Sequence, residues 1–260
     1  MYASNFFLKD DSADSEKAWS IAPAKLQLPI DRVHVWRAQL DEACAPADTF
    51  AQILSRRERD RAQRFHFERD RKRFISSHVI LHQILGRYFE NDPSRLEFFY
   101  GPYGKPYVRN QDGDTLGFNM AHSRDMALYA FARTRQIGVD IECVESVPET
   151  ASIAQTLFSE RERAAWRTVS ADKQPELFFN WWTLKEAYGK ALGYGLTQSL
   201  DQFPVLLADT KASAGLSTAE MVDKNVAWSF KMFAPVPGYV AAIVVEGPRR
   251  ALNQWDWSPC

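Results

Sequence analysis

The sequence predicts an α+β protein made of two similar halves, and two observations lead to this class. Short alternating apolar stretches of strand type are separated by longer segments with helical periodicity. A helix-start pattern at Ser55–Glu58 also returns 104 positions later at Ser159–Glu162. We therefore expect two pseudo-symmetric halves, each a small antiparallel sheet packed with helices, with the active site between them.

These patterns divide the chain into four segments. We expect an N-terminal tail over residues 1–30, since its first part is polar and acidic, and a C-terminal tail over 251–260. The first half should span 31–133. The second half should span 134–250 and carry the functional site.

Within the first half, alternation predicts a strand at Val33–Trp36, and helical spacing predicts a helix with an apolar face from Phe74 to Tyr88. Residues 126–132 and 136–143 are apolar enough for two adjacent strands, joined around 133–135. A hairpin is expected near the end of the second half, with strands at 226–233 and 239–245.

Composition and charge exclude several classes of protein. The formal net charge is -1, so no overall field attracts nucleic acid or a membrane surface. No apolar run reaches the roughly 20 residues that span a bilayer. The three cysteines, Cys44, Cys143 and Cys260, show neither metal-ligand spacing nor a disulfide framework, which favours a reducing compartment. We expect a cytoplasmic protein that binds neither nucleic acid nor membrane.

Two carboxylates two residues apart form the first candidate site. Side chains at such spacing on a strand share a face, so Asp140 and Glu142 project together while Val139 and Ile141 face the core. Two like charges on one face favour a hard divalent cation such as Mg²⁺. Two solvated carboxylates on an edge strand explain this hexapeptide equally well.

A helix over 178–196 supplies the second candidate. On it Trp182, Glu186 and Lys190 stack on one face at i, i+4 and i+8, with Lys185 beside them. An acidic group flanked by two lysines suits a metal-bound pyrophosphate, with Glu186 completing the metal shell. An amphipathic helix with a surface Glu186–Lys190 pair is the alternative.

Two further segments carry polar groups that could contact phosphate. His122 and Ser123 follow one another on a candidate strand, so they point to opposite faces and form no catalytic triad; His122 suits a phosphate ligand. Residues 56–73 hold nine basic residues against four acidic ones. Such a run is most often a solvated helix face, although a few of its arginines could hold a nucleotide phosphate.

Taken together, these motifs resemble the 4′-phosphopantetheinyl transferases, specifically their long, Sfp-like group. In family order the matching elements are Gly104-Lys105-Pro106, Phe118-Asn119-Met120-Ala121-His122-Ser123, Gly138-Val139-Asp140-Ile141-Glu142 and Trp182-Thr183-Leu184-Lys185-Glu186-Ala187 with Lys190. The resemblance covers about residues 50 to 245. Ala121 departs from the usual serine and Val139 from the commoner isoleucine, and both changes are conservative.

The resemblance implies a function and a role for each matching residue. The enzyme should transfer 4′-phosphopantetheine from coenzyme A to a serine of an apo carrier protein with Mg²⁺, releasing 3′,5′-ADP. The metal ligands would be Asp140, Glu142 and Glu186. Catalytic roles would fall to Glu186 as proton acceptor, directly or through a water, and to Lys190 or Lys185 at the leaving group. Coenzyme A would contact Arg61, Arg73, Lys105, Pro106, His122, Ser123, Lys185 and Lys190.

Other expectations concern partners and rival functions. Glu162 matches an acidic family position near the metal, but a role in capping a helix explains it equally well. Phe158, Trp166 and Tyr188 are candidates for carrier docking, with core burial as the alternative. The two halves in one chain favour a monomer. Two rival functions are another Mg²⁺-dependent phosphoryl enzyme acting on a nucleotide pyrophosphate, and a non-catalytic module that binds carrier proteins.

Overall fold

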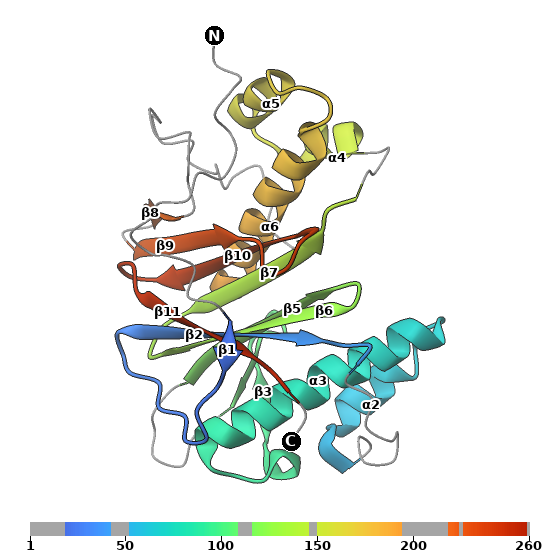
Figure 1. The fold of residues 1–260 in the computed structure, drawn as a ribbon, viewed down its shortest axis with the longest axis vertical. Helices are drawn as coiled ribbons and strands as arrows, with labels where there is room; N and C mark the ends of the chain where they lie inside the picture. The colour runs from blue at the N-terminus through green and yellow to red at the C-terminus, as the bar shows by residue number, and fades with distance from the viewer. Residues whose placement is uncertain are drawn as a thin grey trace.

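The computed structural model describes residues 19–42, 52–108, 116–145, 150–193, 218–223 and 226–258. Its helices are α2 (Arg56–Ala62), α3 (Glu68–Phe89), α4 (Thr150–Leu157), α5 (Glu160–Arg167) and α6 (Gln174–Leu192), with a 3₁₀ turn η1 (Pro93–Arg95). Figure 1 shows α3 beneath the strands, and α4, α5 and α6 on the opposite side.

Two sheets of the same design form the centre of the molecule. The first has the order β1-β11-β2-β6-β5, built from β1 (Ser20–Ile21), β11 (Ala251–Asp256), β2 (Arg32–Gln39), β6 (Met126–Arg133) and β5 (Leu116–Ser123). The second has the order β7-β10-β9-β8, built from β7 (Ile137–Cys143), β10 (Tyr239–Glu246), β9 (Val226–Phe233) and β8 (Thr218–Asp223). A short separate ribbon pairs β3 (Phe98–Tyr100) with β4 (Pro106–Val108).

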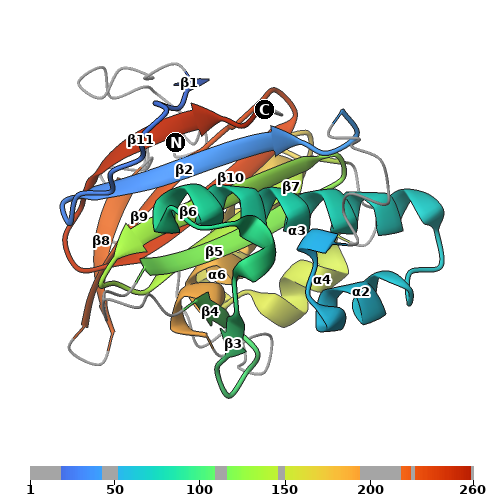
Figure 2. The same cartoon turned by 90° about the horizontal axis from the view of Figure 1, so that it is seen from below.

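The sheets pack face to face, and each carries one long helix on its outer face (Figures 1 and 2). Val35 and Leu128 of the first sheet meet Val139 and Ile243 of the second in one apolar cluster. The outer face of the first sheet packs on α3, and the outer face of the second packs on α6. Each long helix thus covers a separate core, as two similar halves require.

The helix starts confirm the internal repeat. Ser55 N–H donates to Glu58 Oε2 at 2.8 Å, and Ser159 N–H donates to Glu162 Oε2 at 2.7 Å. Both serines also accept a hydrogen bond from the backbone N–H of their glutamate, which completes a capping box in each half. The expected hairpin near the end of the second half is also present, as β9 and β10.

Residues 126–132 and 136–143 are consecutive strands, but they do not pair with one another. β6 pairs with β2 and β5, whereas β7 pairs with β10. The connection at 134–136 carries the chain from one sheet to the other. β6 lies between the helix layer and the second sheet, which explains why nearly all of its residues are buried.

Both expected tails contain ordered structure, so the predicted boundaries there are wrong. β11 occupies most of 251–260 and pairs in parallel with β2, with Trp255 opposite Trp36. Leu26 and Leu28 of the expected N-terminal tail are buried in the core between the first sheet and α3. These segments bury apolar side chains despite their terminal position, so the first sheet takes strands from both ends of the chain. No described helix combines the length and apolar character needed to cross a bilayer.

Candidate active site

The carboxylates of β7 point toward α6. Val139 and Ile141 are buried between the two sheets, so Asp140 and Glu142 project from the other face of the strand, as predicted. β7 is the edge strand of its sheet, yet Asp140 is only 5% exposed. The solvated alternative is therefore excluded for Asp140.

Close backbone packing brings β7 and α6 together. A Cβ atom built on Gly138 would lie 1.9 Å from Ala187 O and 2.5 Å from Ala191 N. Only a glycine at this position lets the strand approach the helix backbone so closely. Gly138 was quoted in the sequence motif, but its packing role was not predicted from the sequence.

Three side chains of α6 face the carboxylates of β7. Lys190 Nζ donates to Asp140 Oδ1 at 2.6 Å, and Trp182 Nε1 donates to Glu142 Oε1 at 3.3 Å. Glu186 lies between them along the helix, and the charges of Asp140 and Glu142 act on it. The predicted face formed by Trp182, Glu186 and Lys190 is confirmed.

The charges of these carboxylates are poorly compensated. Burial raises the pKa of Asp140, although Lys190 opposes the shift. Burial and the charge of Asp140 raise the pKa of Glu142. Burial, Asp140 and Glu142 together raise the pKa of Glu186 to about 7, against the opposing effect of Lys190. One oxygen each of Asp140 and Glu186 is buried without a hydrogen-bond partner.

Such a group of acids is suited to a cation, but it is not a closed cage. Among the described residues, no group of three or more His, Cys, Asp or Glu side chains stands at metal-ligand spacing. The unpartnered oxygens of Asp140 and Glu186 are the hard donors that a divalent ion would use.

Ser123 contacts the acidic cluster rather than an open surface. Its Oγ donates to Glu142 Oε2 at 2.9 Å and accepts from Cys143 N–H at 3.1 Å. The hydroxyl therefore orients Glu142. His122, on the other face of β5, is exposed.

His122 shares its surroundings with the predicted arginines. Surrounding protein atoms lower its pKa, and the positive charges of Lys190, Arg61 and Arg73 lower it further. Three basic side chains, from α2, α3 and α6, therefore lie within electrostatic reach of His122 on β5. Arg73 is already held by Asp41 through two hydrogen bonds of 2.8 and 2.6 Å. Arg61 stands over the ring of Phe74 at 5.3 Å.

Lys185 does not lie where the prediction placed it. Its side chain is 1% exposed, and Nζ bonds Glu162 Oε2 at 2.9 Å. Its ammonium is engaged on the side of α6 that faces α4 and α5, so it contacts no exposed phosphate position. The face that carries Glu186 was predicted correctly. Lys185 is the preceding residue, so its side chain points about 100° away from Glu186 around the helix axis.

The docking candidates are core residues. Phe158 is 0% exposed, Trp166 9% and Tyr188 3%. Phe158 and Trp166 belong to the apolar cluster between α4, α5 and the start of α6, and Tyr188 packs between α6 and the second sheet. None of the three offers a surface to a partner.

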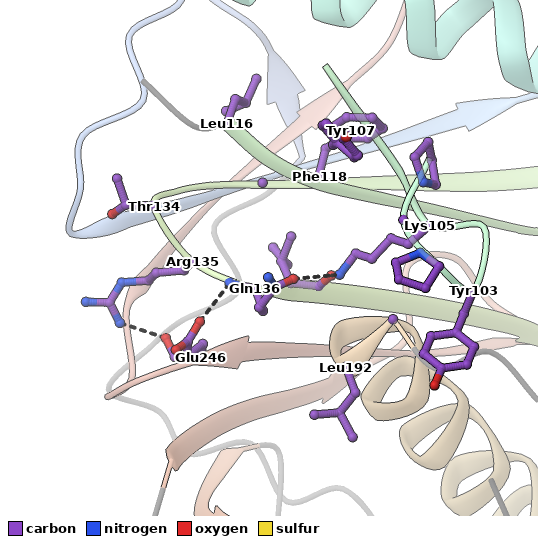
Figure 3. A pocket seen from close by; sticks show the side chains of 16 residues that line it. Tyr103, Lys105, Tyr107, Leu116, Phe118, Thr134, Arg135, Gln136, Leu192 and Glu246 are labelled. Atoms are coloured by element: carbon purple, nitrogen blue, oxygen red, sulfur yellow. Dashed lines mark hydrogen bonds between the residues drawn. The ribbon is translucent and has the colours of Figure 1, made fainter. Parts of the chain in front are cut away.

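Lys105 joins the two halves beside a cavity. Its Nζ donates to Ala191 O at 2.8 Å, to Ile137 O at 3.0 Å and to Gln136 Oε1 at 3.1 Å, so the β3–β4 loop is tied to β7 and α6 (Figure 3). Burial lowers the pKa of Lys105 to about 8. The cavity measures about 540 Å³, and its walls include Tyr103, Lys105, Pro106, Tyr107, Phe118 and Leu192.

Comparisons with known proteins agree with this arrangement. Residues 136–244 match the model of the 4′-phosphopantetheinyl transferase superfamily, and residues 35–134 match the model of a 4′-phosphopantetheinyl transferase N-terminal region. The 4′-phosphopantetheinyl transferase HetI of Nostoc sp. (strain PCC 7120) is 36% identical over 94% of this chain and 97% of its own length. The chain belongs to the 4′-phosphopantetheinyl transferase superfamily.

A second relative supports the predicted subgroup. The 4′-phosphopantetheinyl transferase Sfp of Bacillus subtilis is 29% identical over 77% of this chain and 86% of its own length. The two family models meet at residues 134–136, where the chain passes from the first sheet to the second. The resemblance to the long, Sfp-like transferases is therefore confirmed, together with the α+β fold of two similar halves.

Proposed function

We propose that this transferase moves 4′-phosphopantetheine from coenzyme A to a serine of an apo carrier protein and releases 3′,5′-ADP, with Mg²⁺ held by Asp140, Glu142 and Glu186. The observation that carries the proposal is the convergence of these carboxylates from β7 and α6. Their pKa values are raised, and two of their buried oxygens lack a partner. A bound Mg²⁺ would stabilise negative charge on the pyrophosphate of coenzyme A.

The proton of the attacking serine needs an acceptor close to the metal. We assign this role to Glu186, directly or through a water that it orients, because it lies beside Asp140 and Glu142, where the serine would attack. Lys190 is 30% exposed and reaches the acidic cluster from the open side. Its ammonium would stabilise the departing 3′,5′-ADP.

The rest of coenzyme A would bind along the junction of the halves. Arg61, Arg73 and His122 form the electropositive region suited to its 3′-phosphate, with Arg73 also engaged by Asp41. The adenine would contact the loop at Lys105 and Pro106. The cavity beside this loop is lined largely by aromatic and apolar groups, which suits a planar base.

Further proposals concern partners and compartment. Several arginines of the basic run bond within the protein: Arg59 to Leu54 O, Arg71 to Glu68, and Arg73 to Asp41. Part of the charge of this run is therefore used within the protein, which supports the proposal that it does not serve nucleic acid. We also propose a monomer in the cytoplasm. The carrier must approach from the side on which Glu186 and Lys190 meet Asp140.

Mass spectrometry of the acceptor tests the function. The full chain is mixed with coenzyme A, Mg²⁺ and an apo acyl carrier protein, and the carrier is weighed. We expect a gain of one phosphopantetheine that a chelator abolishes. Release of 3′,5′-ADP without a mass gain on the carrier would instead indicate a pyrophosphatase. A mass gain that persists in chelator would contradict the metal assignment.

A further inference from the structure

A buried ion pair lies immediately behind the proposed metal ligand Glu186. Lys185 and Glu162 are each 1% exposed in their side chains, and their charged atoms are 2.9 Å apart. Glu162 Oε2 also accepts the capping hydrogen bond from Ser159 N–H at 2.7 Å. One carboxylate oxygen therefore joins the start of α5 to the middle of α6.

The ammonium of Lys185 is enclosed by the α4–α5 corner. Leu157 O lies 3.4 Å from Nζ, and the ring of Phe158 lies 5.7 Å from it. Phe158 itself is fully buried. A buried ammonium is costly unless it is paired and hydrogen-bonded, so these contacts hold Lys185 in one orientation.

The same helix is fixed on a second side. Gly138 of β7 contacts the backbone of α6 at Ala187 and Ala191. Lys185 and Ala187 flank Glu186 in sequence, and side chains on a helix advance by about 100° per residue. Contacts on both sides of Glu186 fix the rotation and the height of α6, and thereby the direction of the Glu186 carboxylate.

We propose that the Glu162–Lys185 pair is a positioning element that aims Glu186 at Asp140 and Glu142. Lys185 then acts through the orientation of α6 and does not contact phosphate. This inference rests on the proposed role of Glu186 as a metal ligand. It gives Glu162 two roles: it caps α5, and it holds Lys185 of α6 in place.

The first half contains a natural control. Glu58 closes the capping box of α2 and bonds the buried His82 of α3 at 3.1 Å, as Glu162 bonds Lys185. Neither Gln83 nor Leu81, the neighbours of His82, is a carboxylate. The first half thus has the same tie between a capping glutamate and its long helix without a metal ligand beside it.

The experiment compares two double variants of the full chain. Glu162→Gln/Lys185→Met removes both charges of the pair together, so neither residue is left as a lone buried charge and the fold should persist. We expect its Mg²⁺ requirement for transfer to rise by about tenfold or more, as for other residues that orient metal ligands. The KM for coenzyme A at saturating Mg²⁺ should change by less than about twofold, because no phosphate contact is lost.

Metal binding is also measured without turnover, by titrating Mn²⁺ into each variant with coenzyme A and no carrier and following the electron paramagnetic resonance of free Mn²⁺. Weaker Mn²⁺ binding by Glu162→Gln/Lys185→Met is expected. The control Glu58→Gln/His82→Met should keep the wild-type Mg²⁺ requirement within about twofold, whatever its loss of thermal stability.

Three results would overturn the inference. A raised KM for coenzyme A with an unchanged Mg²⁺ requirement would make Lys185 a phosphate contact. An equal rise in the Mg²⁺ requirement of the control would show a general effect of loosening the fold. If the double variant fails to fold, Glu162→Asp is measured instead, because it keeps both buried charges and only shortens the carboxylate. An unchanged Mn²⁺ affinity there would equally refute the positioning role. A wild-type enzyme without any Mg²⁺ requirement would instead refute the proposed metal site, on which this inference rests.

Discussion

The two halves of the transferase share their parts but differ in what they bury. Each has a capping box, a long helix and a three-stranded antiparallel core, β2-β6-β5 in the first half and β7-β10-β9 in the second. The registers also correspond. Gln39 pairs with Met126 at the end of β2, and Cys143 pairs with Tyr239 at the end of β7.

This correspondence places Trp36 and Ala38 at the strand positions of Asp140 and Glu142. Trp36 is 1% exposed and Ala38 2%, both in the core beneath α3. The first half buries apolar groups at these positions, whereas the second has a buried and a half-buried carboxylate whose pKa values are raised. The shared scaffold therefore provides stability in both halves, and a site arises only where the second half gives up apolar burial.

The largest expected effect, a loss of activity, comes from replacing Asp140, a carboxylate with no counterpart in the first half. Asp140→Ala should lower kcat/KM by about two to three orders of magnitude, because a proposed metal ligand is lost. Metal-free thermal stability should not fall, since burial opposes ionisation of this carboxyl. Transfer assays and calorimetry measure the two effects. Asp31→Ala, at an exposed position, serves as the control, and near-normal turnover of Asp140→Ala would refute the metal assignment.

The second prediction concerns the closest approach between strand and helix. Gly138 occupies the strand position that His34 has in the first half. The second half leaves no room for a side chain there, whereas the first half accommodates a histidine. Gly138→Ala should destabilise the fold by roughly 3 kcal/mol, since its Cβ would lie 1.9 Å from Ala187 O. It should also weaken Mg²⁺ binding, because it would move β7 away from α6.

Urea denaturation and metal titration measure these two consequences. Gly101→Ala is the matched control, because its Cβ would meet nothing closer than Lys105 O at 3.7 Å. Equal stability of Gly138→Ala and Gly101→Ala would show that the two layers are not packed as closely as the structure indicates.

Sensitivity to acid should come from His34 in the first half. His34 is 4% exposed, and burial, with the nearby charge of Arg32, lowers its pKa from 6.5 to about 4. Acid protonates His34 in the unfolded chain first, so stability is lost as pH falls from about 6.5 towards 4. The loss from this residue should reach about 2 kcal/mol by pH 5.

His34→Gln should flatten that part of the pH dependence of urea denaturation. Glutamine can keep the hydrogen bond that links His34 to the Tyr88 hydroxyl at 2.8 Å, but it does not titrate. His66→Gln, at an exposed histidine, is the control and should leave the slope unchanged. The same slope in His34→Gln and the wild type would place the acid sensitivity elsewhere.

The sequence predicted the repeat and the shared face of the two carboxylates because both depend on local periodicity. A capping box spans four residues, and the shared face of Asp140 and Glu142 depends only on strand alternation. The position of Lys185 depends on where α4 and α5 pack, which is long-range information. The prediction accordingly gave it a phosphate contact instead of Glu162.

The terminal strand was missed for a related reason. Residues 251–256 alternate too weakly to predict a strand, and β11 exists because β2 offers it a partner more than 200 residues away in sequence. The function itself came from the joint order of four motifs, which no single motif could have provided. Pairing over long distances therefore escaped local reasoning, whereas the family could be identified from the motifs.

The smallest expected effect concerns Lys105. Its side chain joins the two halves, whereas each of the other substitutions lies within one half. Its three acceptors, Gln136 Oε1, Ile137 O and Ala191 O, carry no formal charge. Lys105→Met loses these hydrogen bonds but also removes a partly buried ammonium, so stability at pH 7 should change by only about 1 kcal/mol.

The pH dependence of stability is more informative than its value at pH 7. Because burial lowers the pKa of Lys105 to about 8, the native state releases its proton before the unfolded chain does. Wild-type stability should therefore gain a contribution as pH rises from 8 towards 10, and Lys105→Met should lack it. Urea midpoints at pH 7.5 and 9.5 measure the difference, and Lys25→Met, at an exposed lysine, should behave as the wild type. Parallel pH profiles in the wild type and Lys105→Met would show that the ammonium is solvated and does not join the halves.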